Sequence, residues 1–251
     1  MDDADLTTTP ELSIVVPALD ERENVGPLVE QVEAAMQGRV ASFELVVVDD
    51  GSTDGTGDKL RELQQTRPWL RVLRREQPRG QSAAMKAGIM AARGAWVAFL
   101  DADLQNDPAE LPSMLDQAKA GGFDLVQGDR SRNRKDTFFK RRASWVGRSF
   151  RRMVLGDRIR DTGCSARVLK AEYARRLPLE FKGMHRFIPA YTARLGGKVS
   201  EFEVQHRPRA AGETKYGVGV LTRGLAGLFD LFAVRWMGNR MRDTSTTETS
   251  L

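Results

Sequence analysis

Short apolar runs alternate with helical patterns through about the first 130 residues of the chain. The run LSIVVPA at 12–18 is apolar and rich in β-branched residues, which is typical of a buried strand. From residue 24 to residue 36 the apolar positions recur at helical spacing instead. The alternation continues with predicted strands at FELVVVDD, LRVLRR, AWVAFL and FDLVQG, and with predicted helices at DGTGDKLRELQQT, SAAMKAGIMAA and 108–120. This order predicts right-handed βαβ units, and therefore an α/β fold with a mostly parallel sheet and helices on both faces.

Polar clusters follow four of the predicted strands. The first strand ends in PALDE and the second in DDGSTDG, while two later strands end in DADLQ and GDRSR. In an open parallel sheet, ligands bind beyond the carboxyl ends of the strands. We therefore expect the four clusters to meet at one edge of the sheet and to form a shared ligand site.

The DADLQ cluster places two carboxylates directly after a buried strand. Asp101 and Asp103 follow an apolar run that ends at Leu100. Two such groups repel each other unless one is protonated or a cation lies between them. Oxygen ligands of this kind suit Mg²⁺ or Mn²⁺, which commonly bind one or two carboxylates together with substrate phosphates. Gln105, two residues further on, could add a carbonyl oxygen. Taken alone, the stretch is equally compatible with a solvated turn.

The second strand also ends in two carboxylates, Asp49 and Asp50. An Asx turn and a helix N-cap would explain part of this cluster, but a remaining carboxylate suits a base N–H or a ribose hydroxyl. Further along the chain, Arg209 and Lys215 lie on either side of Gly212. They offer a bidentate fork and a point charge for phosphate, although a solvated loop would have the same composition.

Two later segments combine basic and aromatic residues at helical spacing, at 138–155 and at 217–237. A basic amphipathic helix with aromatic side chains suits the surface of an anionic membrane, and it suits equally a helix that packs on the sheet. The second segment should not span a membrane, because charged residues interrupt it at Arg223, Asp230 and Arg235.

The composition limits the remaining alternatives. The 251 residues allow one domain over 11–237, between a flexible N-terminus at 1–10 and a disordered polar tail at 238–251. A net charge of +5 favours an anionic partner. A single cysteine, Cys164, excludes an intrachain disulfide and a thiolate zinc cluster, and we interpret it as a small packed residue. We find neither a secretory signal nor an uncharged apolar stretch of spanning length, which predicts a cytoplasmic protein.

Two enzyme classes fit the sequence poorly. The first predicted strand is followed by PALDEREN, which lacks the G-x-G-x-x-G of a dinucleotide-binding oxidoreductase. The two histidines, His185 and His206, have no visible partners for a Ser/His/Asp triad, so we interpret both as surface or satisfied side chains.

Six motifs together resemble those of a known family. IVVPALDERENV, VVVDDGSTDGT, FLDADLQNDP, GDRSR, DTGCSARV and RAAGETKYG occur in the order found in inverting GT-A glycosyltransferases of family 2. The sequence is most similar to the polyprenyl-phosphate group, which includes dolichyl-phosphate mannose synthases, and the resemblance covers roughly residues 11–237. It implies a Rossmann-like GT-A fold, with 138–155 and 217–237 as interface helices and no transmembrane helix.

The resemblance also implies roles for individual residues. The nucleotide would be bordered by Pro17, Leu19 and Glu21, and its base and ribose would contact Val48 and Asp50. The metal and the sugar diphosphate would be held by Asp101, Ala102, Asp103 and Gln105, with Asp101, Asp103 and Gln105 as metal ligands. Phosphates would contact Arg130, Arg209 and Lys215, and Arg141 would approach the acceptor phosphate. The catalytic residues would be Asp103, Arg130 and Arg141. The chain departs from many relatives at Leu19, where they carry an aromatic residue, and at TGCSAR, where they carry TSGFRA.

The implied reaction moves a sugar, with inversion, from GDP-mannose or a UDP-sugar to a polyprenyl or dolichyl phosphate. The acceptor needs no general base, because a phosphate monoester has a second pKa of about 6 and is already anionic at neutral pH. The implied cofactor is Mg²⁺ or Mn²⁺, and the implied location is the cytoplasmic face of an anionic membrane, without nucleic acid as a partner. The sequence leaves the oligomeric state open. A family 2 enzyme with a saccharide or protein acceptor is the main alternative. A non-enzymatic basic protein that binds nucleic acid or membrane would leave the strand-end clusters without a role.

Overall fold

The computed structural model describes residues 9–131, 147, 149–208, 220–240 and 242, with side chains from 227 onward in the last helix except at 228. Three predicted site residues, Arg141, Arg209 and Lys215, therefore lie outside the described residues. The same holds for residues 138–146, 148 and 217–219 of the two predicted interface helices, for residues 1–8 of the N-terminus, and for 241 and 243–251 of the predicted tail.

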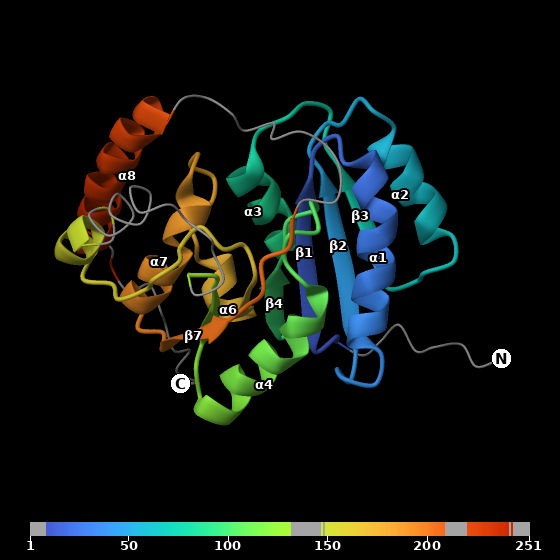
Figure 1. Ribbon diagram of the computed structural model, residues 1–251, viewed down its shortest axis with the longest axis horizontal. Helices are drawn as coiled ribbons and strands as arrows, with labels where there is room; N and C mark the ends of the chain where they lie inside the picture. The colour runs from blue at the N-terminus through green and yellow to red at the C-terminus, as the bar shows by residue number, and fades with distance from the viewer. Residues whose placement is uncertain (1–8, 132–146, 148, 209–219, 241, 243–251) are drawn as a thin grey trace, which may run out of the picture.

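A mixed sheet forms the centre of the molecule (Figure 1). Its seven strands have the order β3-β2-β1-β4-β6-β5-β7. All neighbouring strands pair in parallel except β6, which is antiparallel to both β4 and β5. The strands are β1 (Leu12–Ala18), β2 (Phe43–Asp49), β3 (Leu70–Arg74), β4 (Trp96–Phe99), β5 (Leu125–Asp129), β6 (Arg167–Lys170) and β7 (Val199–Glu203). The predicted mostly parallel sheet is confirmed.

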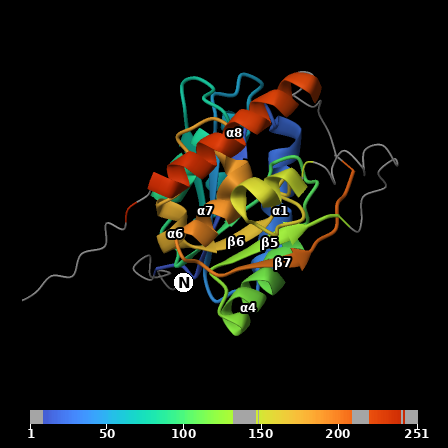
Figure 2. The same cartoon turned by 90° about the vertical axis from the view of Figure 1, so that its left-hand side faces the viewer.

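Helices cover both faces of this sheet. One face carries α1 (Arg22–Met36), α2 (Thr56–Gln64) and α4 (Leu111–Gly121), with the short 3₁₀ helix η1 (Pro108–Glu110) leading into α4. The other face carries α3 (Gln81–Ala91), α6 (Ala171–Arg175), α7 (Ile188–Arg194) and α8 (Val220–Arg240), with the 3₁₀ helix η2 (Met184–Phe187) before α7. A further helical segment at 149–155 lies beside α8 (Figure 2).

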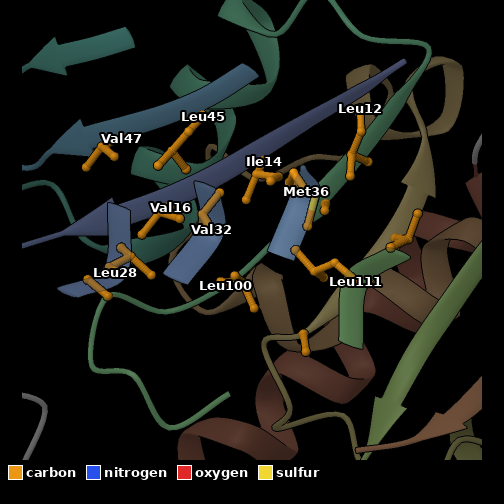
Figure 3. Close-up of a cluster of buried hydrophobic side chains, with 14 of the residues drawn as sticks. Leu12, Ile14, Val16, Leu28, Val32, Met36, Leu45, Val47, Leu100 and Leu111 are labelled. Atoms are coloured by element: carbon orange, nitrogen blue, oxygen red, sulfur yellow. The ribbon is translucent and has the colours of Figure 1, made fainter. Parts of the chain in front are cut away.

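The alternation of side chains along each strand divides the apolar residues between two cores. Ile14 and Val16 of β1 join the core under α1, which Figure 3 shows with Leu28, Leu45 and other buried side chains. Val15, between them, joins the core under α3 and α7. Because successive strand residues point to opposite faces, continuous apolar strands such as β1 and β2 are what a doubly covered sheet requires.

Two differences from the sequence expectations stand out. The strands β6 and β7 and the helices α6 and α7 were not predicted. In addition, α8 continues to Arg240, so the disordered tail predicted from residue 238 does not include 238–240. Contacts hold this last turn: Arg194 Nη1 donates to Asn239 Oδ1 at 3.4 Å, and the Arg240 guanidinium lies 5.0 Å from the Trp236 ring centre. No helix in the described parts of the chain is long and apolar enough to cross a membrane.

Candidate active site

A cleft opens at the carboxyl ends of β1, β2 and β4. These strands are neighbours and run in parallel, so the loops that follow them begin at the same edge of the sheet. The described residues that line the cleft are Pro17, Ala18, Leu19, Glu21, Asp50, Gln81, Ala84, Asp101, Ala102 and Asp103. Three of the four strand-end clusters that we expect at one site thus line this cleft, and the fourth contributes the charge of Arg130, which lowers the pKa of Asp101. The fourth cluster follows β5, which β6 separates from β4.

Hydrogen bonds lock the loop after β1 to the loop after β2. The backbone N–H of Asp20 donates to Ser52 Oγ at 2.8 Å, and the N–H of Thr53 donates to Asp20 Oδ1 at 2.8 Å. The N–H of Glu21 donates to Thr56 Oγ1, also at 2.8 Å. Asp20 adopts a left-handed backbone conformation with φ +49°, which aspartate tolerates better than most residues. These bonds fix the side of the cleft that the loop after β1 forms.

Both carboxylates that end β2, Asp49 and Asp50, accept hydrogen bonds from other groups of the protein. Asp49 Oδ1 accepts the Ser52 N–H at 2.9 Å, whereas the Asx turn forms at Asp54, whose Oδ1 accepts the Thr56 N–H at 2.9 Å. Asp50 lines the cleft, but its Oδ1 accepts from Arg75 Nη1 at 3.0 Å and its Oδ2 accepts the Gly80 N–H at 2.8 Å. The Arg79 N–H lies 3.1 Å from both oxygens. Asp50 therefore anchors the start of α3.

The two carboxylates after β4 have a different environment. Asp101 Oδ1 accepts from Gln81 Nε2 at 2.7 Å, and Asp103 Oδ1 accepts the Gln105 N–H at 3.2 Å. Burial raises the pKa of the Asp101 carboxyl, and the negative charge of Asp103 raises it further. Between Asp103 and Gln105, the buried Leu104 has φ +61°, an uncommon conformation for leucine that turns the chain sharply at this point.

A divalent cation fits this donor set. Asp101 and Asp103 supply hard oxygen atoms at the cleft wall, and a cation would relieve their mutual repulsion. Within the described residues, no group of three or more His, Cys, Asp or Glu side chains could hold a metal ion. The two carboxylates would therefore bind a cation together with oxygen atoms of a substrate, as Mg²⁺ commonly does.

Arg130 directly follows β5 and forms a buried ion pair. Its Nε donates to Asp161 Oδ2 at 2.7 Å and its Nη2 donates to Asp161 Oδ1 at 3.1 Å, a bidentate arrangement that fixes the plane of the guanidinium. The two bonds to Asp161 use two of the five N–H groups of the guanidinium, and the others, on Nη1 and Nη2, could contact an anion.

The sequence matches a family model over residues 13–178, and the model describes glycosyl transferase family 2. The chain belongs to glycosyltransferase family 2. It is 40% identical to a dodecaprenyl-phosphate galacturonate synthase of Rhizobium johnstonii, over 89% of this chain and 66% of that protein. It is 34% identical to an undecaprenyl-phosphate 4-deoxy-4-formamido-L-arabinose transferase of Edwardsiella ictaluri, over 86% of this chain and 66% of that protein. The family 2 chain thus spans about two thirds of the length of these curated relatives.

Solved structures support the GT-A fold of this family 2 chain. A glucosyl-3-phosphoglycerate synthase from Mycobacterium tuberculosis, in complex with Mn²⁺, UDP and glucosyl-3-phosphoglycerate, has a TM-score of 0.65 at 22% identity, over 94% of this chain and 82% of that one. A mannosyltransferase from Pyrobaculum calidifontis, in complex with GDP-Man and Mn²⁺, has a TM-score of 0.59 at 19% identity, over 79% of this chain and 57% of that one. At these identities the likeness establishes the fold.

The structure adds two residues that the sequence analysis of this family 2 chain did not select. Gln81 begins α3, lines the cleft and binds Asp101. Arg167 begins β6, is only 2% exposed, and donates to the backbone carbonyls of His185, at 2.8 Å, and Cys164. Burial lowers the pKa of Arg167 to about 10, although the negative charge of Asp101 acts in the opposite direction. Arg167 therefore stays cationic at neutral pH. Arg167 lies in the quoted DTGCSARV motif, whereas Gln81 had no comparable signal.

Four further residues are placed by the structure outside the cleft lining. Val48 is fully buried in β2, on the side that faces Gly88 of α3. Gln105 is half-buried, and its carbonyl oxygen accepts the Arg207 N–H at 2.9 Å. Cys164 is buried and burial raises the pKa of its thiol to about 11, which is consistent with a packed residue and not with a nucleophile. His185 is a satisfied side chain, because its Nδ1 lies 2.8 Å from Ser82 Oγ.

Proposed function

We propose that this chain transfers a sugar from a nucleotide sugar to a polyprenyl phosphate, with inversion at the anomeric carbon and with Mg²⁺ or Mn²⁺ as cofactor. The observation that carries the proposal is the cleft in which Asp101 and Asp103 face Asp50 across the end of β1. The names of the two curated relatives support the acceptor class, since both refer to a polyprenyl phosphate. The donor is GDP-mannose or a UDP-sugar.

The proposed roles combine the positions of the side chains that line the cleft with the resemblance to the polyprenyl-phosphate group. Pro17, Leu19 and Glu21 border the nucleotide from the loop after β1, and this loop is held by its hydrogen bonds to the loop after β2. Asp101 and Asp103 hold the divalent cation, with Gln105 as the proposed third ligand. The bound cation would stabilise the charge that develops on the leaving nucleoside diphosphate.

The acceptor phosphate needs a binding site more than a base. As a monoester it is already anionic at neutral pH, so the protein has to bring it close to a second anion and orient it for attack. Arg130 is suited to this task, because Asp161 fixes its guanidinium plane in the buried wall after β5. We assign the same task to Arg141 on the acceptor side, and phosphate contacts of the donor to Arg209 and Lys215.

The proposed location is the cytoplasmic face of a membrane, to which the chain attaches peripherally. A polyprenyl phosphate keeps its hydrocarbon chain in the bilayer, so the enzyme must reach the head group at the surface. The segments 138–155 and 217–237 are the proposed attachment helices. Peripheral attachment through basic residues should weaken as the salt concentration rises.

The test of this function is a donor and acceptor screen on the purified chain. Thermal unfolding with Mn²⁺ should identify the donor, because only a nucleotide sugar that binds the native state raises the melting temperature. The selected donor should then give a polyprenyl-phosphate sugar in a transfer assay, and EDTA should abolish the product. Full transfer in EDTA would contradict the proposed cofactor, and transfer to a saccharide or protein in preference to the lipid would contradict the proposed acceptor.

A further inference from the structure

The segment 161–165, which lies before β6, contacts two separate parts of the candidate site. At its start, Asp161 forms the bidentate ion pair with Arg130 after β5. At its end, Ser165 contacts Asn106, in the loop that follows β4 and carries the two carboxylates of the cleft. The strands β4 and β5 are not neighbours in the sheet, because β6 lies between them. The segment therefore joins two loops that the sheet itself does not bring into contact.

The backbone of this segment is clamped against β5. Gln127 of β5 is fully buried, and its Nε2 lies 2.9 Å from the carbonyl oxygen of Cys164 and 3.2 Å from that of Asp161. Arg167 also donates to the Cys164 carbonyl. The packing is close as well, since a Cβ on Gly128 would lie only 2.8 Å from Cys164 Sγ. The polar side chains of the segment are therefore held at fixed positions.

The hydroxyl group of Ser165 connects a buried amide to a carboxylate of the cleft. Asn106 is 4% exposed, and its Nδ2 donates to Ser165 Oγ at 2.7 Å. Its Oδ1 lies 3.5 Å from the Cys164 thiol, which fixes the orientation of the amide. Because Ser165 already accepts from Asn106, its single hydroxyl hydrogen is available for another acceptor. That acceptor is Asp101, to which Ser165 is hydrogen-bonded.

Asp101 is thus held by two neutral donors that come from different parts of the fold. Gln81 of α3 donates to its Oδ1 at 2.7 Å, and Ser165 donates from the segment before β6. Two donors on one carboxylate restrict the rotation of its plane, and neutral donors do so without cancelling its charge. Metal-binding carboxylates are commonly oriented by hydrogen bonds of this kind, and their loss lowers metal affinity.

We infer that Ser165 is a positioning residue of the proposed metal site, whose hydroxyl, held by Asn106, orients the Asp101 carboxylate toward a divalent cation. The inference rests on the proposed function, because that function gives Asp101 a cation to bind. The described residues that line the cleft do not include Ser165. It therefore acts through Asp101 and not through contact with a substrate.

A Mn²⁺ titration followed by thermal unfolding tests this role without turnover. The probe is Mn²⁺, added to the full chain in the presence of UDP and, in parallel, of GDP. Ser165→Ala should raise the Mn²⁺ concentration that gives half of the full increase in melting temperature by about tenfold. Ser165→Thr keeps a hydroxyl group and should stay within about threefold of the wild type.

Ser200→Ala is the matched control. Ser200 is also half-buried, and its Oγ also accepts from a side-chain amide, that of Gln117, at 2.9 Å. It lies on β7 and not in the cleft lining. The control should lower the melting temperature of the metal-free chain about as much as Ser165→Ala does, and it should leave the required Mn²⁺ concentration unchanged.

A double-mutant cycle tests the contact itself and needs neither metal nor substrate. Urea unfolding in EDTA is measured for Ser165→Ala, for Asp101→Ala and for the two combined. Ser165→Ala should lower the urea midpoint of the wild type. It should lower it much less in the Asp101→Ala background, because the hydroxyl group has already lost its acceptor there.

Two results would overturn the positioning role and leave the proposed function intact. One is an additive cycle, which would show that Ser165 does not bind Asp101. The other is a non-additive cycle with an unchanged Mn²⁺ requirement in Ser165→Ala, which would make the contact purely structural. A wild type that Mn²⁺ stabilises with neither nucleotide would instead contradict the proposed metal site, and the role of Ser165 would fail together with it.

Discussion

Two strand ends of this protein look alike in the sequence and differ in the structure. β2 and β4 are both apolar and both lead into a pair of carboxylates, Asp49 with Asp50 and Asp101 with Asp103. Asp50 accepts hydrogen bonds from an arginine and from two backbone N–H groups. Asp101 has hydrogen bonds to neutral groups, the amide of Gln81 and the side chain of Ser165, and burial together with the charge of Asp103 raises its pKa.

The difference separates a structural pair from a functional one. The first pair is neutralised by the protein's own groups, so it stabilises the loops that shape the cleft. The second pair brings like charges together at the cleft wall, where a ligand of opposite charge would gain the most. The fold supplies positive charge here too, since Arg167 and Arg130 lower the pKa of Asp101, but burial and the charge of Asp103 outweigh them. A buried acidic pair therefore indicates a cation site where the positive groups of the fold leave the pKa of a carboxyl raised.

The largest expected effect distinguishes the two pairs by activity. Asp103→Asn keeps the shape of the side chain and removes its charge, so we expect transfer to fall by about 10³-fold. The melting temperature should change less than in the corresponding variant of the other pair, Asp50→Asn. Initial rates with the donor identified by the screen, together with thermal unfolding, measure both quantities. A variant with the activity of the wild type would show that Asp103 is not part of the metal site.

The second prediction concerns the stability that the first pair supplies. Asp50→Ala leaves the mostly buried Arg75 without its counter-charge and leaves the N–H groups of Arg79 and Gly80 without an acceptor. We expect the free energy of unfolding to fall by about 3 kcal/mol in urea titrations.

Asp58→Ala is the control for this variant. Asp58 pairs with Arg61 on the surface of α2, and its side chain is 72% exposed. Removing it should cost less than about 0.5 kcal/mol. If Asp50→Ala were as mild as this control, the carboxylates of β2 would not have the structural role that their contacts indicate.

The sequence was sufficient to predict the βαβ units, whose strands are long apolar runs. β1 and β2 are long, apolar and β-branched, and their pattern specifies both their limits and their burial on two faces. β6 has only four residues and begins with the buried Arg167, and β7 reads VSEFE with mostly half-buried positions. Neither shows the apolar run or the clear alternation that predicts a strand. Their pairing depends on strands that lie far away in the chain.

The candidate site also contains residues that could be predicted from the sequence and residues that could not. Its carboxylates could be located because each follows a predicted strand, and parallel strands end at one edge. The partners of Asp50 could not, because Arg75 and Gly80 lie 25 and 30 residues further along the chain. Gln81 was missed for a related reason. A glutamine at the start of a helix has no distinctive chemistry until the fold places it beside Asp101.

A smaller effect concerns the anchoring of α3, the helix whose start contacts both pairs. His185 binds Ser82 of this helix, and burial together with the charges of Arg167 and Arg186 lowers its pKa from 6.5 to about 3. Between these two values the unfolded chain binds a proton that the native state excludes, so stability decreases as the pH falls below 6.5. We expect a loss on the order of 2 kcal/mol between pH 7 and pH 5.

Urea titrations at the two pH values measure this loss, and His185→Gln should reduce it, because glutamine cannot take up the proton. Equal pH dependence in the wild type and in the variant would assign the loss to other groups. It would also leave the anchoring of α3 independent of pH.

The smallest expected effect is that of Gln81→Ala. It tests the comparison of the two acidic pairs directly, because the short segment 79–81 contacts Asp50 of one pair and Asp101 of the other. Arg79 and Gly80 bind Asp50 through their backbone N–H groups, whereas Gln81 binds Asp101 through its side chain. Gln81→Ala should therefore loosen Asp101 and leave Asp50 in place. We expect transfer to fall by about tenfold, with a higher metal concentration needed for half-maximal rate and less than about 1 kcal/mol lost in stability.

The matched control for Gln81 is Gln117→Ala. Gln117 Nε2 also donates a side-chain hydrogen bond, to Ser200 Oγ at 2.9 Å, but it lies on α4 and not in the cleft lining. Its removal should leave the metal dependence of transfer unchanged. If Gln81→Ala behaved in the same way, Asp101 would keep its position without the amide. The difference between the two acidic strand ends would then lie in the carboxylates alone and not in the helix that joins them.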